Sequence, residues 1–207
     1  MKINSTSSIA IGILFIMSVA GMGCKKKDLE RIATAVVVVA AAKLLYDMYI
    51  EHKSEQKKDE NQVVNKYRAE HQQLPPQARL VSYESAIKPG EVVNPGNKIS
   101  IVSSLEVVRG VDTELVDIQE RITIFDNEDN TKELKSMVKA VNKDTKKCGA
   151  FENEFTFTLP KGMPQGVYPI KTAVIINGVE STQVDSRMQL VYFGDSETET
   201  YRIAKAD

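Results

Sequence analysis

Apolar residues at every second position recur through the C-terminal part of the chain, and no other feature constrains its fold as strongly. Side chains of a β-strand point alternately to the two faces of a sheet, so this period predicts strands that bury one face. Turn-forming runs such as Lys88-Pro89-Gly90 separate the groups. We therefore expect a mainly β fold, an antiparallel β-sandwich over residues 77–194 followed by a polar tail at 195–207. The apolar groups are Ile99, Ile101, Leu105 and Val107; Val116, Ile118, Ile122 and Ile124; Phe155, Phe157 and Leu159; Ile170, Val174 and Ile176; and Val184, Met188, Leu190 and Tyr192.

Two local features refine the predicted sandwich. Asn177-Gly178 stands between two apolar groups and is the preferred two-residue hairpin turn, because both positions require positive φ. The run from Leu159 to Tyr168 resembles the tyrosine corner of immunoglobulin-like and fibronectin-type sandwiches. That resemblance implies an Ig-like module in which the Tyr168 hydroxyl bonds to a nearby backbone group, without the cysteine pair or core tryptophan of antibody domains. Residues Thr131–Asn142 fit either a helix or an edge strand.

The N-terminus has the layout of an export signal, which we place at residues 1–23. Lys2 supplies an early positive charge, and an apolar run then extends from Ile9 to Met22. This run is too short for a comfortable transmembrane span, and it ends in small residues, as a signal peptidase requires. The cysteine that follows, Cys24, resembles the modified cysteine in the lipobox of bacterial lipoproteins.

The lipobox resemblance implies that Cys24 becomes the first mature residue and carries lipid, palmitate included, on its thiol and amine. Gly21 stands where that family prefers leucine, so ordinary cleavage and an uncleaved anchor remain alternatives. The residue after the cysteine is Lys25 and not aspartate, which in that family favours the outer membrane. The expected address is the bacterial cell envelope, with the protein membrane-anchored and facing the periplasm.

Residues 24–76 have the composition of a lipid-anchored helical stalk, since residues 28–72 contain neither proline nor glycine. The apolar run at 32–42 is open to three interpretations: a second spanning helix, a helix lying on the membrane surface, or a helix that packs against a partner. Self-association through a helix at 29–50 follows from the last of these.

The second half of the stalk is expected to be a spacer. Residues Glu51–Asn61 are nearly all charged or polar, which predicts a solvated helix or a loose linker. Val63, Val64 and Tyr67 supply one docked turn, and the proline pair at 75–76 then ends the helix.

The chain offers no residue set suited to nucleophilic or acid–base catalysis. Its only histidines, His52 and His71, fall in the stalk, where we expect them to be solvated. No CxxC pair, metal-ligand spacing or glycine-rich phosphate loop occurs in the sequence, so we expect no enzyme activity, cofactor or metal. The balance of 27 Lys+Arg against 28 Asp+Glu also disfavours a nucleic-acid partner.

Three features of the sandwich could still carry chemistry. Cys148 follows Lys146-Lys147, whose charges would lower a thiol pKa, although a lone half-exposed thiol in a turn is the simpler interpretation. Glu120 interrupts an apolar group, either as a functional carboxylate in a pocket or, more simply, as an edge-strand residue or the partner of a lysine. The acidic loop at 126–130 resembles a calcium loop only loosely and predicts a solvated turn.

Together these observations favour a non-enzymatic cell-envelope lipoprotein whose Ig-like module binds another envelope protein or supports an assembly at the membrane surface. One alternative is a periplasmic module that binds a small ligand or a glycan, for which Tyr83, Tyr192 and Phe193 are the few aromatic candidates. Another is a membrane protein with uncleaved N-terminal anchor helices. The lack of histidine in the sandwich disfavours a hydrolase.

Overall fold

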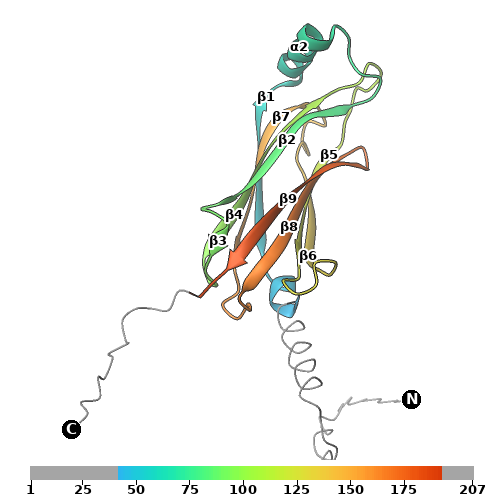
Figure 1. Cartoon of the computed structure of the whole chain (residues 1–207). Coiled ribbons are helices and arrows are strands. Elements are labelled where there is room, and N and C mark those ends of the chain that lie inside the picture. The colour runs from blue at the N-terminus through green and yellow to red at the C-terminus, as the bar shows by residue number, and fades with distance from the viewer. Residues whose placement is uncertain (1–41, 193–207) are drawn as a thin grey trace, which may run out of the picture.

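The computed structural model of this 207-residue chain describes residues 42–192. After a helical segment at 42–46, two β-sheets pack face to face, with one helix at the end of the molecule opposite that segment (Figure 1). The elements are β1 (Ile50–Lys58), α2 (Glu60–His71), β2 (Arg79–Lys88), β3 (Val92–Val93), β4 (Lys98–Val108), β5 (Ile118–Phe125), β6 (Glu133–Ala140), β7 (Gly149–Thr158), β8 (Gly166–Ile176) and β9 (Val179–Leu190).

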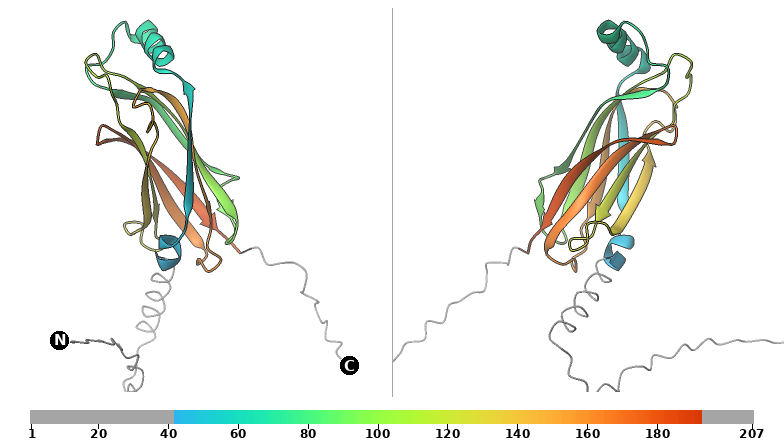
Figure 2. Two further views of the ribbon diagram at one scale, coloured as in Figure 1. Left: turned by 180° about the vertical axis from the view of Figure 1, so that it is seen from behind. Right: turned by 45° about the vertical axis from the view of Figure 1, so that its right-hand side comes forward.

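The two sheets contain four and five strands. Their strand orders are β1-β7-β4-β2 and β3-β9-β8-β5-β6, and every pairing is antiparallel except the short parallel contact between β3 and β9. The views in Figure 2 show the sheets as two layers, with β1 and β6 on one side of the sandwich. The predicted mainly β sandwich is confirmed.

The core lies between the sheets and is built from the predicted alternating positions. Ile101 and Phe155 of the four-stranded sheet are fully buried together with Ile124 and Ile170 of the five-stranded sheet. Burial of each such side chain contributes about 1.5–3 kcal/mol to folding. A second cluster around Leu105 continues the core toward the α2 end.

Both local predictions are confirmed by the geometry. The Tyr168 hydroxyl donates a hydrogen bond of 2.8 Å to the Pro164 carbonyl oxygen, as a tyrosine corner requires. Asn177 and Gly178 have φ values of 50° and 81°, which suit the β8–β9 hairpin turn. The ambiguous segment Thr131–Asn142 contains an edge strand, β6, rather than a helix.

The expectation of a solvated helix or loose linker at Glu51–Asn61 is wrong up to Lys58. Ile50–Lys58 is an edge strand of the four-stranded sheet, in register with β7 from Ile50 opposite Phe157 to Lys58 opposite Ala150. An edge strand tolerates charged side chains, because its hydrogen bonds come from the backbone and one of its faces is solvated. The β-sandwich therefore begins at Ile50 and not at residue 77.

The docked turn predicted at Val63, Val64 and Tyr67 extends over all of α2, and these three residues are buried. Asp59 caps the helix with Gln62: the Gln62 N–H donates to Asp59 Oδ1 at 2.8 Å, and the Asp59 N–H donates to Gln62 Oε1 at 2.9 Å. The buried side of α2 packs on the outward faces of β4 and β7 in a separate cluster. This helix is part of the folded module, so the spacer prediction is wrong here too.

The predicted export signal, Cys24, most of the apolar run at 32–42 and the polar tail lie outside the described residues. None of the helices in the described range 42–192 is long and apolar enough to cross a membrane.

Candidate functional site: an open groove on the four-stranded sheet

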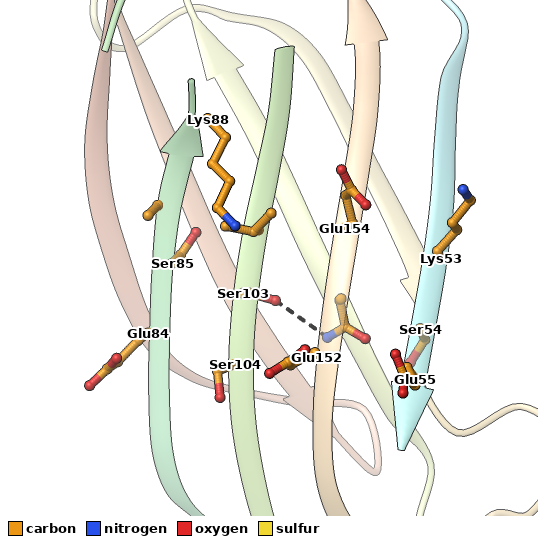
Figure 3. A pocket seen from close by; sticks show the side chains of 13 residues that line it. Lys53, Ser54, Glu55, Glu84, Ser85, Lys88, Ser103, Ser104, Glu152 and Glu154 are labelled. Atoms are coloured by element: carbon orange, nitrogen blue, oxygen red, sulfur yellow. Dashed lines mark hydrogen bonds between the residues drawn. The ribbon is translucent and has the colours of Figure 1, made fainter. Parts of the chain in front are cut away.

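The outward face of the four-stranded sheet is hollowed into a groove of about 840 Å³. Four strands form it, because alternate residues of β1, β2, β4 and β7 point away from the core. α2 covers the outward face of the same sheet at one end and leaves the rest open. Figure 3 shows the groove side chains standing along the four strands.

Charged side chains dominate the groove, with an excess of carboxylates. Small and apolar residues, Ala86, Val102 and Ser104 among them, form the rest of its lining. The charged members are Lys53, Glu55, Glu84, Lys88, Glu152 and Glu154, four carboxylates against two lysines.

Hydrogen bonds favour the ionised form of one groove carboxylate, Glu154. A hydrogen bond from Ser100 lowers the pKa of Glu154, with help from Thr156 and from the charges of Lys53 and Lys88. Lys57, at the side of the groove, lies 3.1 Å from Glu152 and 2.8 Å from Glu55. These contacts raise the pKa of Lys57. The groove therefore presents fixed charges of both signs, with negative charge in excess.

A buried carboxylate lies beneath the groove floor, between the two sheets. Glu120 of β5 is fully buried and accepts hydrogen bonds from the Tyr83 hydroxyl at 2.7 Å, the Ser103 hydroxyl at 2.8 Å and Asn153 Nδ2 at 2.8 Å. The donors come from β2, β4 and β7, so one carboxylate ties three strands of one sheet to a central strand of the other. Burial raises the pKa of Glu120, and the three hydrogen bonds act in the opposite direction.

The predictions for Glu120 are corrected by this arrangement. β5 lies between β8 and β6 and is no edge strand, and the hydrogen-bond partners of Glu120 are neutral side chains and not a lysine. With no exposed surface, the carboxylate also cannot meet a substrate as a pocket residue would. Its geometry is that of a cross-sheet structural clamp.

Cys148 is buried in the apolar cluster around Leu105 and is not a half-exposed turn thiol. Burial raises the pKa of the thiol to about 12, the nearby Glu60 carboxylate adds to this, and Arg109 opposes it. The lysine effect expected from sequence is absent: Lys146 pairs with Asp117, and neither Lys146 nor Lys147 is among the groups that shift the thiol pKa. A thiol with so high a pKa has little thiolate at neutral pH, so Cys148 is a core residue.

The prediction that both histidines are solvated is wrong for His52. His52 lies on β1 with its ring centroid 4.5 Å from that of Phe155. Burial lowers the pKa of His52, as does the charge of Lys139. His71 stays half exposed at the end of α2, with its ring 4.2 Å from Tyr67.

The acidic loop at 126–130 folds on itself. Asp126 Oδ1 accepts the Glu128 N–H at 2.8 Å, and Asp129 Oδ1 accepts the Thr131 hydroxyl at 2.6 Å. Such internal caps define a turn. Within residues 42–192, no group of three or more His, Cys, Asp or Glu side chains is arranged to hold a metal ion.

The aromatic candidates do not line the groove. Tyr83 points inward to Glu120, and the Tyr192 hydroxyl donates to the carbonyl oxygens of Lys161 at 2.9 Å and Met163 at 2.8 Å. Phe193 lies outside the described residues. Within residues 42–192 the most exposed tyrosines are Tyr46 and Tyr49, at 76% and 78% exposure, and the sequence does not mark either as a binding residue.

Comparison with known proteins yields only distant likenesses. No family model and no curated protein matches the chain. The CARDB domain of the PF1109 protein from Pyrococcus furiosus, solved with di-metal ions, is 13% identical with a TM-score of 0.37, over 57% of this chain and 93% of that one. A cohesin module of a Clostridium perfringens family 33 glycoside hydrolase is 13% identical with a TM-score of 0.30, over 52% and 96%.

A larger protein also shows partial likeness. The alkylpurine DNA glycosylase AlkC of Pseudomonas fluorescens is 16% identical with a TM-score of 0.36, and the match covers 56% of this chain and 31% of AlkC. Likenesses of this strength assign the chain to no family.

Proposed function

We propose that this chain is a non-enzymatic lipoprotein of a bacterial cell envelope, held at the membrane by lipid on Cys24, whose Ig-like sandwich binds a partner protein in the periplasm. The anchor is supported by the apolar run that ends at Gly23-Cys24, and the outer membrane is favoured by Lys25. The immunoglobulin-like character is supported by the Tyr168 corner within a two-sheet sandwich.

The groove on the four-stranded sheet is the observation that carries the binding proposal. Its four carboxylates and two lysines suit a partner segment with an excess of basic side chains, because complementary charge guides encounter and fixes orientation. The length of the groove across four strands suits an extended polypeptide rather than a compact small molecule.

The two competing function classes are less well supported by the groove. Glycan recognition draws much of its contact energy from aromatic faces, and no aromatic residue is among the described residues that line the groove. Catalysis needs an accessible base or nucleophile, whereas Glu120 and Cys148 are sealed in the interior.

The exposed tyrosines indicate which end of the sandwich faces the membrane in the proposed anchoring. Tyr46 ends the helical segment at 42–46 and Tyr49 directly precedes β1. That segment lies at the end of the sandwich opposite α2 (Figure 1). Tyrosine rings suit the boundary between lipid and water. A single copy anchored through Cys24 would therefore stand with α2 farthest from the membrane.

Photo-crosslinking in living cells tests the groove. A photoreactive amino acid at Ser104, in the groove, should trap a partner protein, whereas one at Lys171 on the five-stranded sheet should not. Charge reversal by Glu84→Lys with Glu154→Lys should reduce the crosslinked product about tenfold or more, since like charges would then face each other across the interface with a basic partner.

Glu133→Lys together with Glu91→Lys is the matched control, because both residues are exposed and lie outside the groove. This control pair should leave the crosslink intact at the same change of net charge. Equal crosslinking from Ser104 and Lys171, or equal loss in both charge-reversed proteins, would contradict the groove as the binding site.

A further inference from the structure

β1 presents a free strand edge. In the order β1-β7-β4-β2 it pairs with β7 alone among the described strands, so its other side carries unpaired backbone donors and acceptors. Two of the other sheet edges are less available, since β3 has two residues and β2 lies beside β9 of the opposite sheet. The remaining edge, β6, has eight residues and serves as the comparison in the test of the pairing. β1 is therefore a long edge at which another strand could be added.

The outward side chains of β1 alternate in sign. Glu51, Lys53, Glu55 and Lys57 occupy alternate positions of the strand. Lys53 and Glu55 line the groove, Lys57 contacts Glu55 and Glu152, and Glu51 lines a separate pocket beside Tyr49. An antiparallel copy of this strand, related by a two-fold axis at Ser54, places Glu51 opposite Lys57 of the second copy and Lys53 opposite Glu55 of the second copy. By symmetry every one of the four charges then faces its opposite.

The alternating charges also disfavour the neighbouring registers of the pair. A shift that centres the axis on Lys53 or on Glu55 sets each of these residues opposite itself, so that like charges meet across the pair. Lysines on an edge strand ordinarily discourage pairing, but alternating signs discourage it only in the wrong register. The bulge between Gln56 and Lys58 lies outside the central Lys53–Glu55 pairs.

We propose that a second copy of this chain binds at β1, antiparallel and centred on Ser54, so that two four-stranded sheets join into one. Tyr49 continues the line of the strand and in this register lies opposite Asp59, at the start of α2 of the second copy. Each end of the interface thus gains an exposed aromatic side chain. The interface is the backbone edge of β1, whereas the groove is a face of the sheet, so the pairing goes beyond the proposed partner binding even though Lys53 and Glu55 belong to both.

The pairing is compatible with anchoring of both copies in one membrane. Antiparallel strands turn the second copy end over end, so the pair lies along the membrane and does not keep the upright orientation of a single copy. The two Ile50 positions are then about 30 Å apart. Residues 25–41 lie between the proposed anchor and the helical segment at 42–46, and 17 residues can reach about 55 Å when extended.

Disulfide trapping of the full-length chain in bacterial cells provides the test. Ser54→Cys should crosslink to itself on mild oxidation, because residues on a two-fold axis lie within disulfide range of each other. Glu133→Cys, at an exposed position on the β6 edge, is the matched control and should stay monomeric.

Exchange of the charges at Lys53 and Glu55 tests whether the two copies pair in the proposed register. In the Ser54→Cys background, Lys53→Glu should weaken the dimer about tenfold or more, since two attractive cross-strand pairs become repulsive. Adding Glu55→Lys should restore crosslinking, because the exchanged charges attract again in the same register. Lys143→Glu, in an exposed loop, makes the same change of net charge and should have no effect.

The possible outcomes separate the occupants of this edge. Rescue by the second reversal supports pairing of two copies centred on Ser54. Crosslinking of Ser54→Cys to a different protein, a yield no higher than that of Glu133→Cys, or failure of the rescue in folded protein would overturn the proposal. Glu84→Lys with Glu154→Lys should not change the dimer, which keeps this test distinct from that of the groove.

Discussion

Glu120 is held in the core as a charge surrounded by neutral donors, and this arrangement makes stability depend on pH. Burial raises the pKa of Glu120 above its ordinary value of 4.5, so the folded state binds a proton more tightly than the unfolded chain does. The free energy of unfolding then falls as the pH rises from below 4.5 through the folded pKa, and it stays lower at neutral pH.

Glu120→Gln should remove that pH-dependent loss. Glutamine keeps an oxygen for Ser103 and Asn153, and its amide can donate to the Tyr83 oxygen, so the network survives without the buried charge. We expect a variant that is more stable than the parent at pH 7 and converges with it in acid. Urea unfolding between pH 4 and pH 8 measures the difference between the two proteins.

An alanine variant and the titration of His52 must be compared with the effect of Glu120→Gln. Glu120→Ala should destabilise at every pH, because each buried donor left without a partner costs about 1–3 kcal/mol. His52 contributes a pH dependence of opposite sign, since its lowered pKa makes stability decline as the pH falls below 6.5. Both proteins contain His52, so its contribution cancels in the difference between them. A glutamine variant with an unchanged pH slope would show that Glu120 is not the titrating group.

At the scale of elements, β1 and α2 belong to the sandwich and set where it begins. Ile50 lies in the main core, and Val63, Val64 and Tyr67 seal the outward faces of β4 and β7. Removal of four such side chains forfeits about 1.5–3 kcal/mol each, a sum comparable with the 5–15 kcal/mol that stabilises a typical domain.

A chain of residues 42–192 should therefore melt cooperatively, whereas residues 77–192 should be largely unfolded at 25 °C. Circular dichroism and urea titration of the two proteins measure this directly. Equal unfolding midpoints would contradict the placement of β1 and α2 in the stable unit, and would return them to the role of a spacer.

At the scale of the whole molecule, the proposed function depends on the lipid at Cys24. Cys24→Ser should abolish incorporation of labelled palmitate and release the protein from the membrane fraction, because the anchoring thiol is lost. Cys148→Ser is the matched control, and its label and location should match the parent, since that thiol is buried in the core. Equal labelling of the Cys24→Ser protein would leave an uncleaved anchor helix as the better explanation.

Where apolar residues alternate or a turn needs positive φ, the sequence alone was sufficient to predict the strand or the turn. The groups around Ile101, Ile122 and Phe155 became core strands, and the turn at Asn177-Gly178 formed as expected, because these signals act between residues close in the chain. The Tyr168 corner is equally local, since its hydrogen-bond acceptor, Pro164, lies in the same loop.

Tertiary structure decided the conformation of β1 and the surroundings of Cys148 and Glu120. Glu51–Lys58 has no apolar period and became a strand only because β7, far along the chain, supplies its backbone partners. Cys148 lies beside two lysines in sequence but in an apolar cluster in space. The three donors to Glu120 come from three separate strands, so its environment exists only after the sheets pack, and pairing between distant segments leaves no local signal to read.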